Sequence, residues 1–130
     1  MKKYKFTLAS IFLSLVGVIA NVNAGETAIE WAPFIKVTNV TDEKLVKAAD
    51  TVNSDFLIKQ EGFMKRELIK KNDTEYADVI YWKTKTDAVA AGKKVNTCVK
   101  CNEYFKLMEM DSKAGEGFSH YIIIKSWKRH

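Results

Sequence analysis

Six periodic segments follow one another in the order strand, helix, strand, strand, helix, strand, and that order limits the possible folds more than any other feature. Side chains alternate between two faces where a strand is predicted, whereas apolar positions recur every three or four residues where a helix is predicted. The strands are expected at residues 27–37, 63–71, 75–83 and 118–127, and the helices at residues 41–60 and 86–110.

Local signals mark where several of these segments begin and end. Thr41 is a natural N-cap residue, and Asp42 and Glu43 would place negative charge in the first helical turn, where the helix dipole favours it. Gly62 is expected to end that helix. Between the second and third strands, the polar triplet Asn-Asp-Thr at 72–74 indicates a hairpin turn.

This order predicts an α+β fold, a ferredoxin-like βαββαβ sandwich with both helices on one face of a four-stranded antiparallel sheet. The other face would normally be polar, but the last two strands are apolar on both sides. Tyr81 opposes Trp82 in one of them, and Ile122 opposes Ile123 in the other. Exposed apolar faces of this kind are usually covered. We therefore expect a two-fold homodimer, packed sheet to sheet through the open face, with an interface of about 2,000 Å2.

The first 24 residues have the layout of a secretory signal peptide. Three lysines precede a short apolar run, and Val22 and Ala24 occupy the small-residue positions that a signal peptidase reads. We expect cleavage there, export to the periplasm or the medium, no stable membrane insertion afterwards, and a single domain at residues 25–130. Removing three lysines from the 21 basic residues leaves 18 against 16 acidic ones. With so small a net charge and no basic stripe, a nucleic-acid partner is not expected.

Several stretches together resemble one known family. They are QEGFMKREL (60–68), DVIYWKTKTDAVAA (78–91), CNEYFKLM (101–108) and SHYIII (119–124). This combination resembles the antibiotic biosynthesis monooxygenase-like (ABM-like) domains of the dimeric α/β-barrel superfamily. The resemblance implies a dimer whose two sheets close into a barrel, with a pocket between each sheet and its helices. Members of the family include cofactor-independent oxygenases, haem-degrading oxygenases and domains with no settled activity, so the fold alone does not fix the function.

The resemblance does not extend to the haem-degrading branch. Those enzymes carry a tryptophan in the helix after the third strand and a histidine about three turns later. The matching positions here are Ala91 and Cys101, neither of which can take those roles. We therefore expect no haem and no other cofactor.

The chain has two cysteines, Cys98 and Cys101, spaced as C-x-x-C. A c-type haem attachment would need a histidine where Asn102 stands, and a zinc site would need two further ligands, so no metal is expected. Three interpretations stay open: two small core residues, a local disulfide favoured by an oxidising compartment, or a redox-active pair. The weak helix formers Gly92 and Asn96 would let a new helix start just before the pair.

Candidate site residues lie on the predicted strands, where side chains can point into a pocket. His120 has an unperturbed pKa close to neutrality and is the candidate acid or base, with Tyr81 or Arg66 beside it. The candidate ligand-contacting residues are Phe34, Asp78 and Trp82.

Three functions fit these residues. The first is a binding module that encloses a small apolar or aromatic molecule, which the aromatic-rich sheet and the lack of a strong catalytic set favour. The second is a cofactor-independent monooxygenase acting on a phenolic substrate. The third is a thiol-redox module that uses the Cys98/Cys101 pair.

Overall fold

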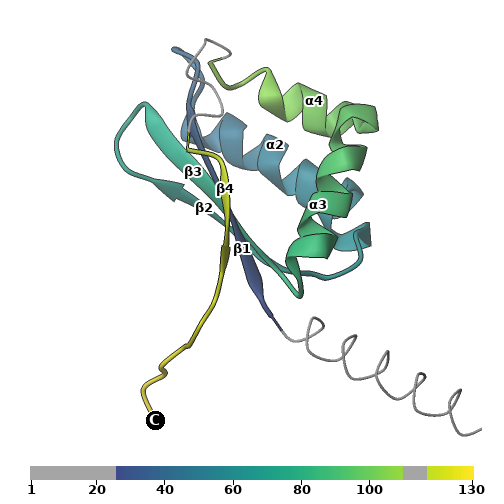
Figure 1. The fold of residues 1–130 in the computed structure, drawn as a ribbon. Helices are drawn as coiled ribbons and strands as arrows, with labels where there is room; N and C mark the ends of the chain where they lie inside the picture. Colours follow the sequence, from purple (N-terminus) through teal and green to yellow (C-terminus); the bar gives the residue numbers. More distant parts are fainter. Residues whose placement is uncertain (1–25, 110–116) are drawn as a thin grey trace, which may run out of the picture.

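The structure, a computed structural model, describes residues 26–109 and 117–130 (Figure 1). The predicted signal peptide, residues 1–24, lies outside these ranges. The elements are β1 (Ala28–Ile35), α2 (Asp42–Asp55), η1 (Leu57–Lys59), β2 (Phe63–Lys70), β3 (Glu75–Trp82), α3 (Lys85–Lys94), η2 (Val95–Thr97), α4 (Val99–Phe105) and β4 (Ser119–Ile122), where η marks a short 3-10 turn.

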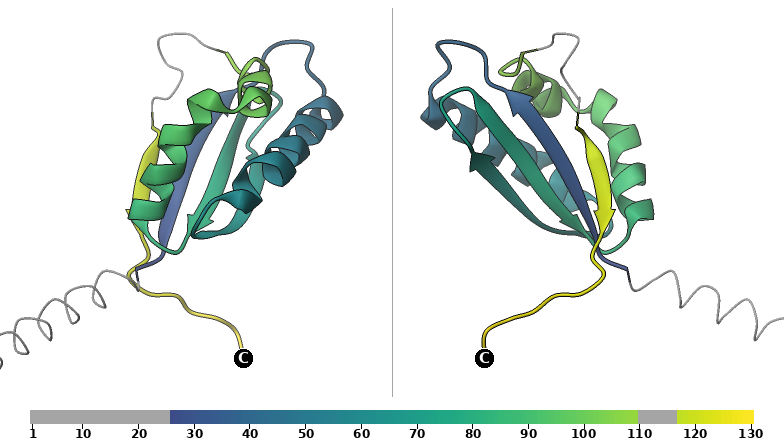
Figure 2. Two further views of the ribbon diagram at one scale, coloured as in Figure 1. Left: turned by 90° about the vertical axis from the view of Figure 1, so that its right-hand side faces the viewer. Right: turned by 60° about the vertical axis from the view of Figure 1, so that its left-hand side comes forward.

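The four strands form one antiparallel sheet in the order β2-β3-β1-β4. β1 pairs with β3 along its whole length and with β4 over its first half, from Ala28 opposite Ile122 to Trp31 opposite Ser119. The three α-helices lie together on one face of the sheet (Figure 2). The predicted ferredoxin-like α+β sandwich is therefore confirmed.

The core lies between the sheet and the helices. Strand alternation sends every second side chain toward the helices, and on β3 these are Tyr76, Asp78, Ile80 and Trp82, all at most 8% exposed. The helices supply buried partners for them: Leu45, Ala49 and Val52 from α2, Ala88 and Ala91 from α3, and Cys101 and Tyr104 from α4.

The first helix begins as the sequence predicts but ends sooner. The Thr41 hydroxyl accepts a hydrogen bond from the Lys44 N–H at 3.1 Å, with Asp42 in the first turn. The α-helix stops at Asp55, five residues before its expected end, and the chain continues through η1. Gly62 then turns it into β2 with a φ of +80°, a left-handed conformation that favours glycine.

The single helix expected at 86–110 is two helices, which corrects that prediction. α3 ends at Lys94, η2 follows, and α4 starts at Val99. Cys98 lies between them in an extended conformation, and its sulfur accepts a hydrogen bond from the Cys101 N–H at 3.1 Å. The break falls where Gly92 and Asn96 make the helix weak.

The last strand is shorter than expected. It was predicted over 118–127 but covers Ser119–Ile122. Its partner β1 begins at Ala28, so the pairing stops shortly beyond Ile122, with one further bond from the Ile123 N–H to the Thr27 carbonyl at 3.0 Å. Alternation continues beyond the strand in the sequence, but there is no β1 residue left for it to pair with.

The face of the sheet opposite the helices carries the other half of each strand. Ile29, Trp31, Val79, Tyr81 and Tyr121 lie on this open face, as their register requires. In residues 26–109 and 117–130, no segment crosses this face (Figure 2). Within the same residues, no helix has the length and apolar character needed to cross a membrane.

Candidate functional site

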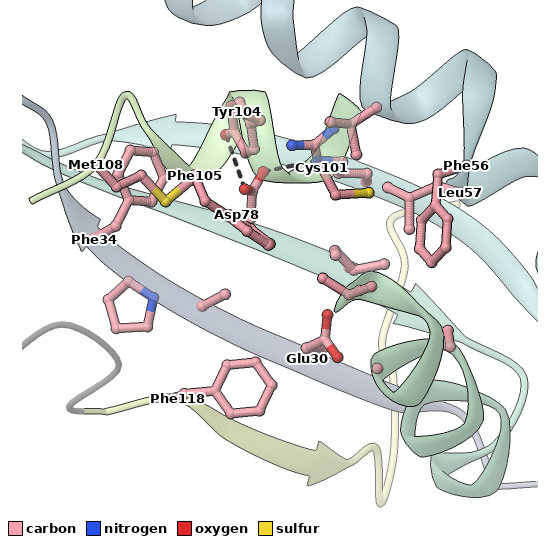
Figure 3. A pocket seen from close by; sticks show the side chains of 18 of the residues that line it. Glu30, Phe34, Phe56, Leu57, Asp78, Cys101, Tyr104, Phe105, Met108 and Phe118 are labelled. Atoms are coloured by element: carbon pink, nitrogen blue, oxygen red, sulfur yellow. Dashed lines mark hydrogen bonds and ion pairs between the residues drawn. The ribbon is translucent and has the colours of Figure 1, made fainter. Parts of the chain in front are cut away.

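A cavity of about 430 Å3 lies between the helix-covered face of the sheet and the helices (Figure 3). Its wall is mainly apolar and draws on both layers. The apolar lining residues are Ala32, Pro33, Phe34, Val52, Phe56, Leu57, Ile80, Trp82, Ala91, Val95, Phe105, Met108 and Phe118. Figure 3 shows Tyr104 of α4 joined to Asp78 of β3 by a hydrogen bond, with Glu30 of β1 and Phe118 lying farther from α4.

A buried polar cluster forms one part of the wall. Asp78 accepts hydrogen bonds from Arg66 Nε at 2.8 Å and from the Tyr104 hydroxyl at 2.9 Å, one on each carboxylate oxygen. The Arg66 Nη1 group also donates to the Ala49 carbonyl at 2.8 Å. The side chains of Arg66 and Asp78 are only 7% and 8% exposed, so this is a buried ion pair with its charges satisfied inside the protein.

Two pKa shifts follow from this cluster. Burial, and then the charge of Asp78, raise the pKa of the Tyr104 hydroxyl, so Tyr104 stays neutral and donates to the carboxylate. Burial alone would lower the pKa of Arg66, but the hydrogen bond and charge of Asp78 outweigh it and raise the pKa. Arg66 therefore keeps its positive charge, and Tyr104 stays a neutral hydrogen-bond donor.

A second polar pair joins the cavity to the edge strand. Glu30 on β1 lies directly opposite His120 on β4, and Glu30 Oε1 lies 3.1 Å from His120 Nε2. Both side chains are largely buried, at 12% and 16% exposed, and Glu30 lines the cavity. Burial raises the pKa of the Glu30 carboxyl above 4.5, although the hydrogen bond from His120 opposes it. The pair therefore joins a carboxyl group of the cavity wall to an imidazole on the edge strand.

The indole of Trp82 supplies an unused donor at the same wall. Trp82 is 1% exposed, and the Phe63 ring lies edge-on to it with 5.8 Å between centroids. Its Nε1–H has no hydrogen-bond partner among the atoms of the described residues. A buried polar group left unpaired in this way costs about 1–3 kcal/mol.

The structure brings most of the predicted site residues to this cavity. Phe34, Arg66, Asp78 and Trp82 line it, and His120 is linked to it through Glu30. Tyr81 does not reach it.

Strand alternation places Tyr81 on the open face, where its ring lies 4.7 Å from the Lys65 ammonium. Sequence reasoning missed two polar side chains of the cavity wall, Glu30 and Tyr104. A carboxylate on the apolar first strand was a signal for Glu30, whereas nothing marked Tyr104 beyond its helical spacing from Cys101.

Cys98 and Cys101 form a disulfide, with 5.2 Å between their Cα atoms. Cys98 is half-buried, whereas Cys101 is 1% exposed and lines the cavity. Over the residues that the structure describes, no cluster of three or more histidine, cysteine or acidic side chains is placed to hold a metal ion.

Comparison with known proteins gives a likeness in structure. No family model matches the chain, and no curated protein matches it in sequence. A crystal structure of SnoaB, a cofactor-independent oxygenase from Streptomyces nogalater, superposes with a TM-score of 0.54 at 12% identity, covering 81% of this chain and 97% of that one. A single-substitution mutant of SnoaB gives the same TM-score and coverage at 13% identity. At this identity the likeness shows the fold alone, and this chain shares the ferredoxin-like α+β fold of SnoaB.

Proposed function

We propose that this protein binds a small, mainly apolar or aromatic molecule in the cavity between its sheet and its helices. One observation carries the proposal: a cavity of about 430 Å3 with an apolar wall and a few converging polar groups. Its size falls within the range of roughly 300–1,000 Å3 that is usual for small-molecule sites. Such a wall favours an aromatic ligand, because burying apolar surface drives the binding.

The polar groups limit which ligands fit. Each oxygen of Asp78 already accepts one hydrogen bond from the protein, so Asp78 is held in the cavity wall. Glu30 engages His120 through one oxygen and lines the cavity, so it can accept a bond from a ligand hydroxyl or amine. A ligand acceptor that reaches Trp82 Nε1 would satisfy the unpaired donor there. The expected ligand is therefore an aromatic molecule with one hydroxyl or amine group.

A fluorescence titration with N-phenyl-1-naphthylamine, a neutral apolar dye, tests the proposal. We expect dye fluorescence to rise on binding and Ala32→Phe, which fills part of the cavity, to weaken binding at least tenfold. Val46→Phe is the matched control, because Val46 is 48% exposed on α2 and does not line the cavity. Thermal melts would establish that both variants fold. Absence of dye binding to the wild type, or equal loss in both variants, would refute the proposal.

A second candidate function is a cofactor-independent monooxygenase acting on an electron-rich phenol. The Glu30–His120 pair favours it, because a base at a dry cavity wall is what such chemistry needs. A deprotonated phenol can pass electrons to dioxygen directly. One oxygen atom would then enter the ring as a carbonyl, and the other would leave as water with two hydrogens from the substrate. No separate reductant is required.

Oxygen uptake with dihydroxyaromatic substrates separates this candidate from simple binding. We expect Glu30→Gln and His120→Ala each to lower the rate by about a hundredfold or more, the usual contribution of a general base. Tyr81→Phe is the control, because Tyr81 lies on the open face. Oxygen uptake no faster than in buffer would exclude the monooxygenase candidate and leave ligand binding as the proposed function.

The proposal also includes the oligomeric state of the protein and its location. The protein acts as a homodimer through its open sheet face, which the apolar side chains there support. It is also exported, which the pattern of residues 1–24 and the Cys98–Cys101 disulfide support. Sequencing the N-terminus of the protein recovered outside the cytoplasm tests export: we expect it to begin at Gly25, and an intact start at Met1 would contradict it.

A further inference from the structure

The Cys98–Cys101 disulfide connects two different surroundings. Cys98 is half-buried and lines a shallow surface groove of about 360 Å3, together with Asp55, Lys94, Thr97 and Lys100. Cys101 is 1% exposed and lines the apolar cavity. Solvent therefore reaches the disulfide from the Cys98 side.

Local backbone structure produces this asymmetry. The turn η2 (Val95–Thr97) carries the chain out of α3, and Cys98 follows in an extended conformation at the start of α4. Cys101 lies one turn further along α4, on the side that also buries Tyr104. The spacing of three residues thus holds one cysteine half-buried beside the groove and the other in the core.

We propose that this disulfide is a thiol–disulfide exchange site, attacked at Cys98 by a small anionic thiol that enters through the surface groove. Exchange requires a thiolate to approach one sulfur of the disulfide, so the accessible sulfur is the one attacked. A disulfide with both sulfurs in the core would open only when the protein unfolds. Here the groove gives a direct route to Cys98 in the folded protein.

The reaction balances without any further reactant. The incoming thiolate forms a bond to Cys98 Sγ, the bond between Cys98 Sγ and Cys101 Sγ breaks, and its electron pair leaves on Cys101 Sγ, which takes a proton from water. The result is a mixed disulfide at Cys98 and a thiol at Cys101. A second small thiol can then attack the mixed disulfide, which reduces Cys98 and oxidises the two small thiols to their own disulfide.

The charge of the groove selects the attacking thiol. Lys94 and Lys100 face a single acidic lining residue, Asp55. Lys100 is also paired with Glu103 at 3.1 Å, so Lys94 is the less neutralised cation. A positive groove attracts a thiol that carries carboxylates, such as glutathione, more than it attracts a cationic one.

Peptide mapping of the wild-type protein tests the site of attack. The folded protein is incubated with reduced glutathione, quenched with acid, blocked with N-ethylmaleimide and digested with trypsin. Cleavage after Lys94, Lys100 and Lys106 separates the two cysteines, placing Cys98 in residues 95–100 and Cys101 in residues 101–106. We expect the glutathione adduct at least tenfold more often on Cys98. Equal amounts on both peptides, more on Cys101, or no adduct without denaturant would overturn the proposal.

Paired variants test the route and the charge. With oxidised glutathione, Cys101→Ser should be modified at Cys98 at least tenfold faster than Cys98→Ser is modified at Cys101. Lys94→Glu should slow exchange with glutathione about threefold at low salt, and Lys44→Glu should not, because Lys44 is exposed on α2 and does not line the groove. Equal modification rates in the two cysteine variants, or equal exchange rates in Lys94→Glu and Lys44→Glu, would contradict the proposal. None of these measurements uses a cavity ligand, so they stand whether or not the dye binds.

Discussion

Asp78 is 6% exposed beneath the helices, yet its position makes it a structural residue more than a catalytic one. Each of its carboxylate oxygens already accepts a hydrogen bond, one from Arg66 and one from Tyr104. These partners come from β2 and α4, so the carboxylate ties the sheet to the helix layer. A buried carboxylate that is bonded through both oxygens in this way holds the cavity wall in place.

Replacing Asp78 should therefore cost stability first. Asp78→Ala leaves the Arg66 guanidinium buried without its counter-ion, and we expect the free energy of unfolding to fall by about 3–5 kcal/mol. Tyr104→Phe removes one hydrogen bond to a charged acceptor and should cost about 1.5–3 kcal/mol. Urea unfolding at one fixed protein concentration measures both. A loss under 1 kcal/mol in Asp78→Ala would show that the cluster does not hold the two layers together.

Burial raises the pKa of the Glu30 carboxyl, so ionising Glu30 costs free energy in the folded protein. The folded state then binds the Glu30 proton more tightly than the unfolded state does. The stability that this residue contributes is full below the unfolded pKa of 4.5 and falls as the pH rises through the folded value.

The Glu30→Gln variant isolates this effect, because glutamine keeps the shape but does not titrate. We expect the wild type to lose stability relative to Glu30→Gln as the pH increases above 4.5, by at most about 1.4 kcal/mol per pH unit. Chemical unfolding of both proteins between pH 4 and 7 gives the difference. If the wild type instead gained stability relative to Glu30→Gln as the pH rises, the hydrogen bond from His120 would outweigh the effect of burial.

At the scale of elements, two glycines have opposite roles. Gly62 joins η1 to β2 with a φ of +80°, and a Cβ atom there would lie 2.1 Å from Asp87 Oδ2. Gly92 lies inside α3, where an added Cβ would meet nothing within 4 Å. Glycine is therefore needed at the first position and is only a source of flexibility at the second.

Alanine substitutions should separate the two roles. Gly62→Ala places a side chain in the left-handed region and should destabilise the protein by about 1–2 kcal/mol or more. Gly92→Ala reduces the freedom of the unfolded chain and should stabilise it by about 0.5–1 kcal/mol. Thermal melts of the two variants against the wild type would show midpoints moving in opposite directions, and a shift of the same sign in both would contradict this account.

Sequence periodicity predicted the type of these elements but not where they end. Helical spacing from Thr86 onward predicted one helix. The same apolar positions are equally consistent with two shorter helices. The break at Cys98 depends on its sulfur, which caps the start of α4. The apolar run at 118–127 alternates like a strand throughout. Its pairing stops at Ala28, the first residue of β1, and the local sequence of one strand does not predict the length of the strand that pairs with it.

At the scale of the whole molecule, alternation predicted two faces for each strand but not which of them the helices cover. Glu30 and Tyr81 illustrate the consequence. Tyr81 was expected at the pocket and lies on the open face, whereas Glu30 was passed over and lines the cavity. Only the register between β1, β3 and β4 assigns both residues to a face. Phe34, Arg66, Asp78 and Trp82 were expected at the pocket and line the cavity, and the same register places all four on the helix-covered face.

The open face leads to the prediction with the widest consequence. Ile35, Ile69 and Tyr121 are between 41% and 56% exposed on it, around the partly buried Trp31 and Val79. An apolar surface of this extent on an isolated chain favours association. Two such faces packed about a two-fold axis would bury about 2,000 Å2, the size of a stable interface, and would leave no second patch for further growth.

A charge placed at the centre of this face should dissociate the dimer without unfolding the subunit. Val79 lies opposite Trp31 on β1 and Glu67 on β2, so Val79→Asp would bury a carboxylate fully at the interface but leave it in contact with solvent on a monomer. Val89→Asp is the control, since Val89 is 40% exposed on α3, across the sheet from this face. We expect sedimentation at micromolar concentration to give a dimer for the wild type and Val89→Asp, and a folded monomer for Val79→Asp. A wild type that sediments as a single chain and melts cooperatively would show that the face stays open in solution.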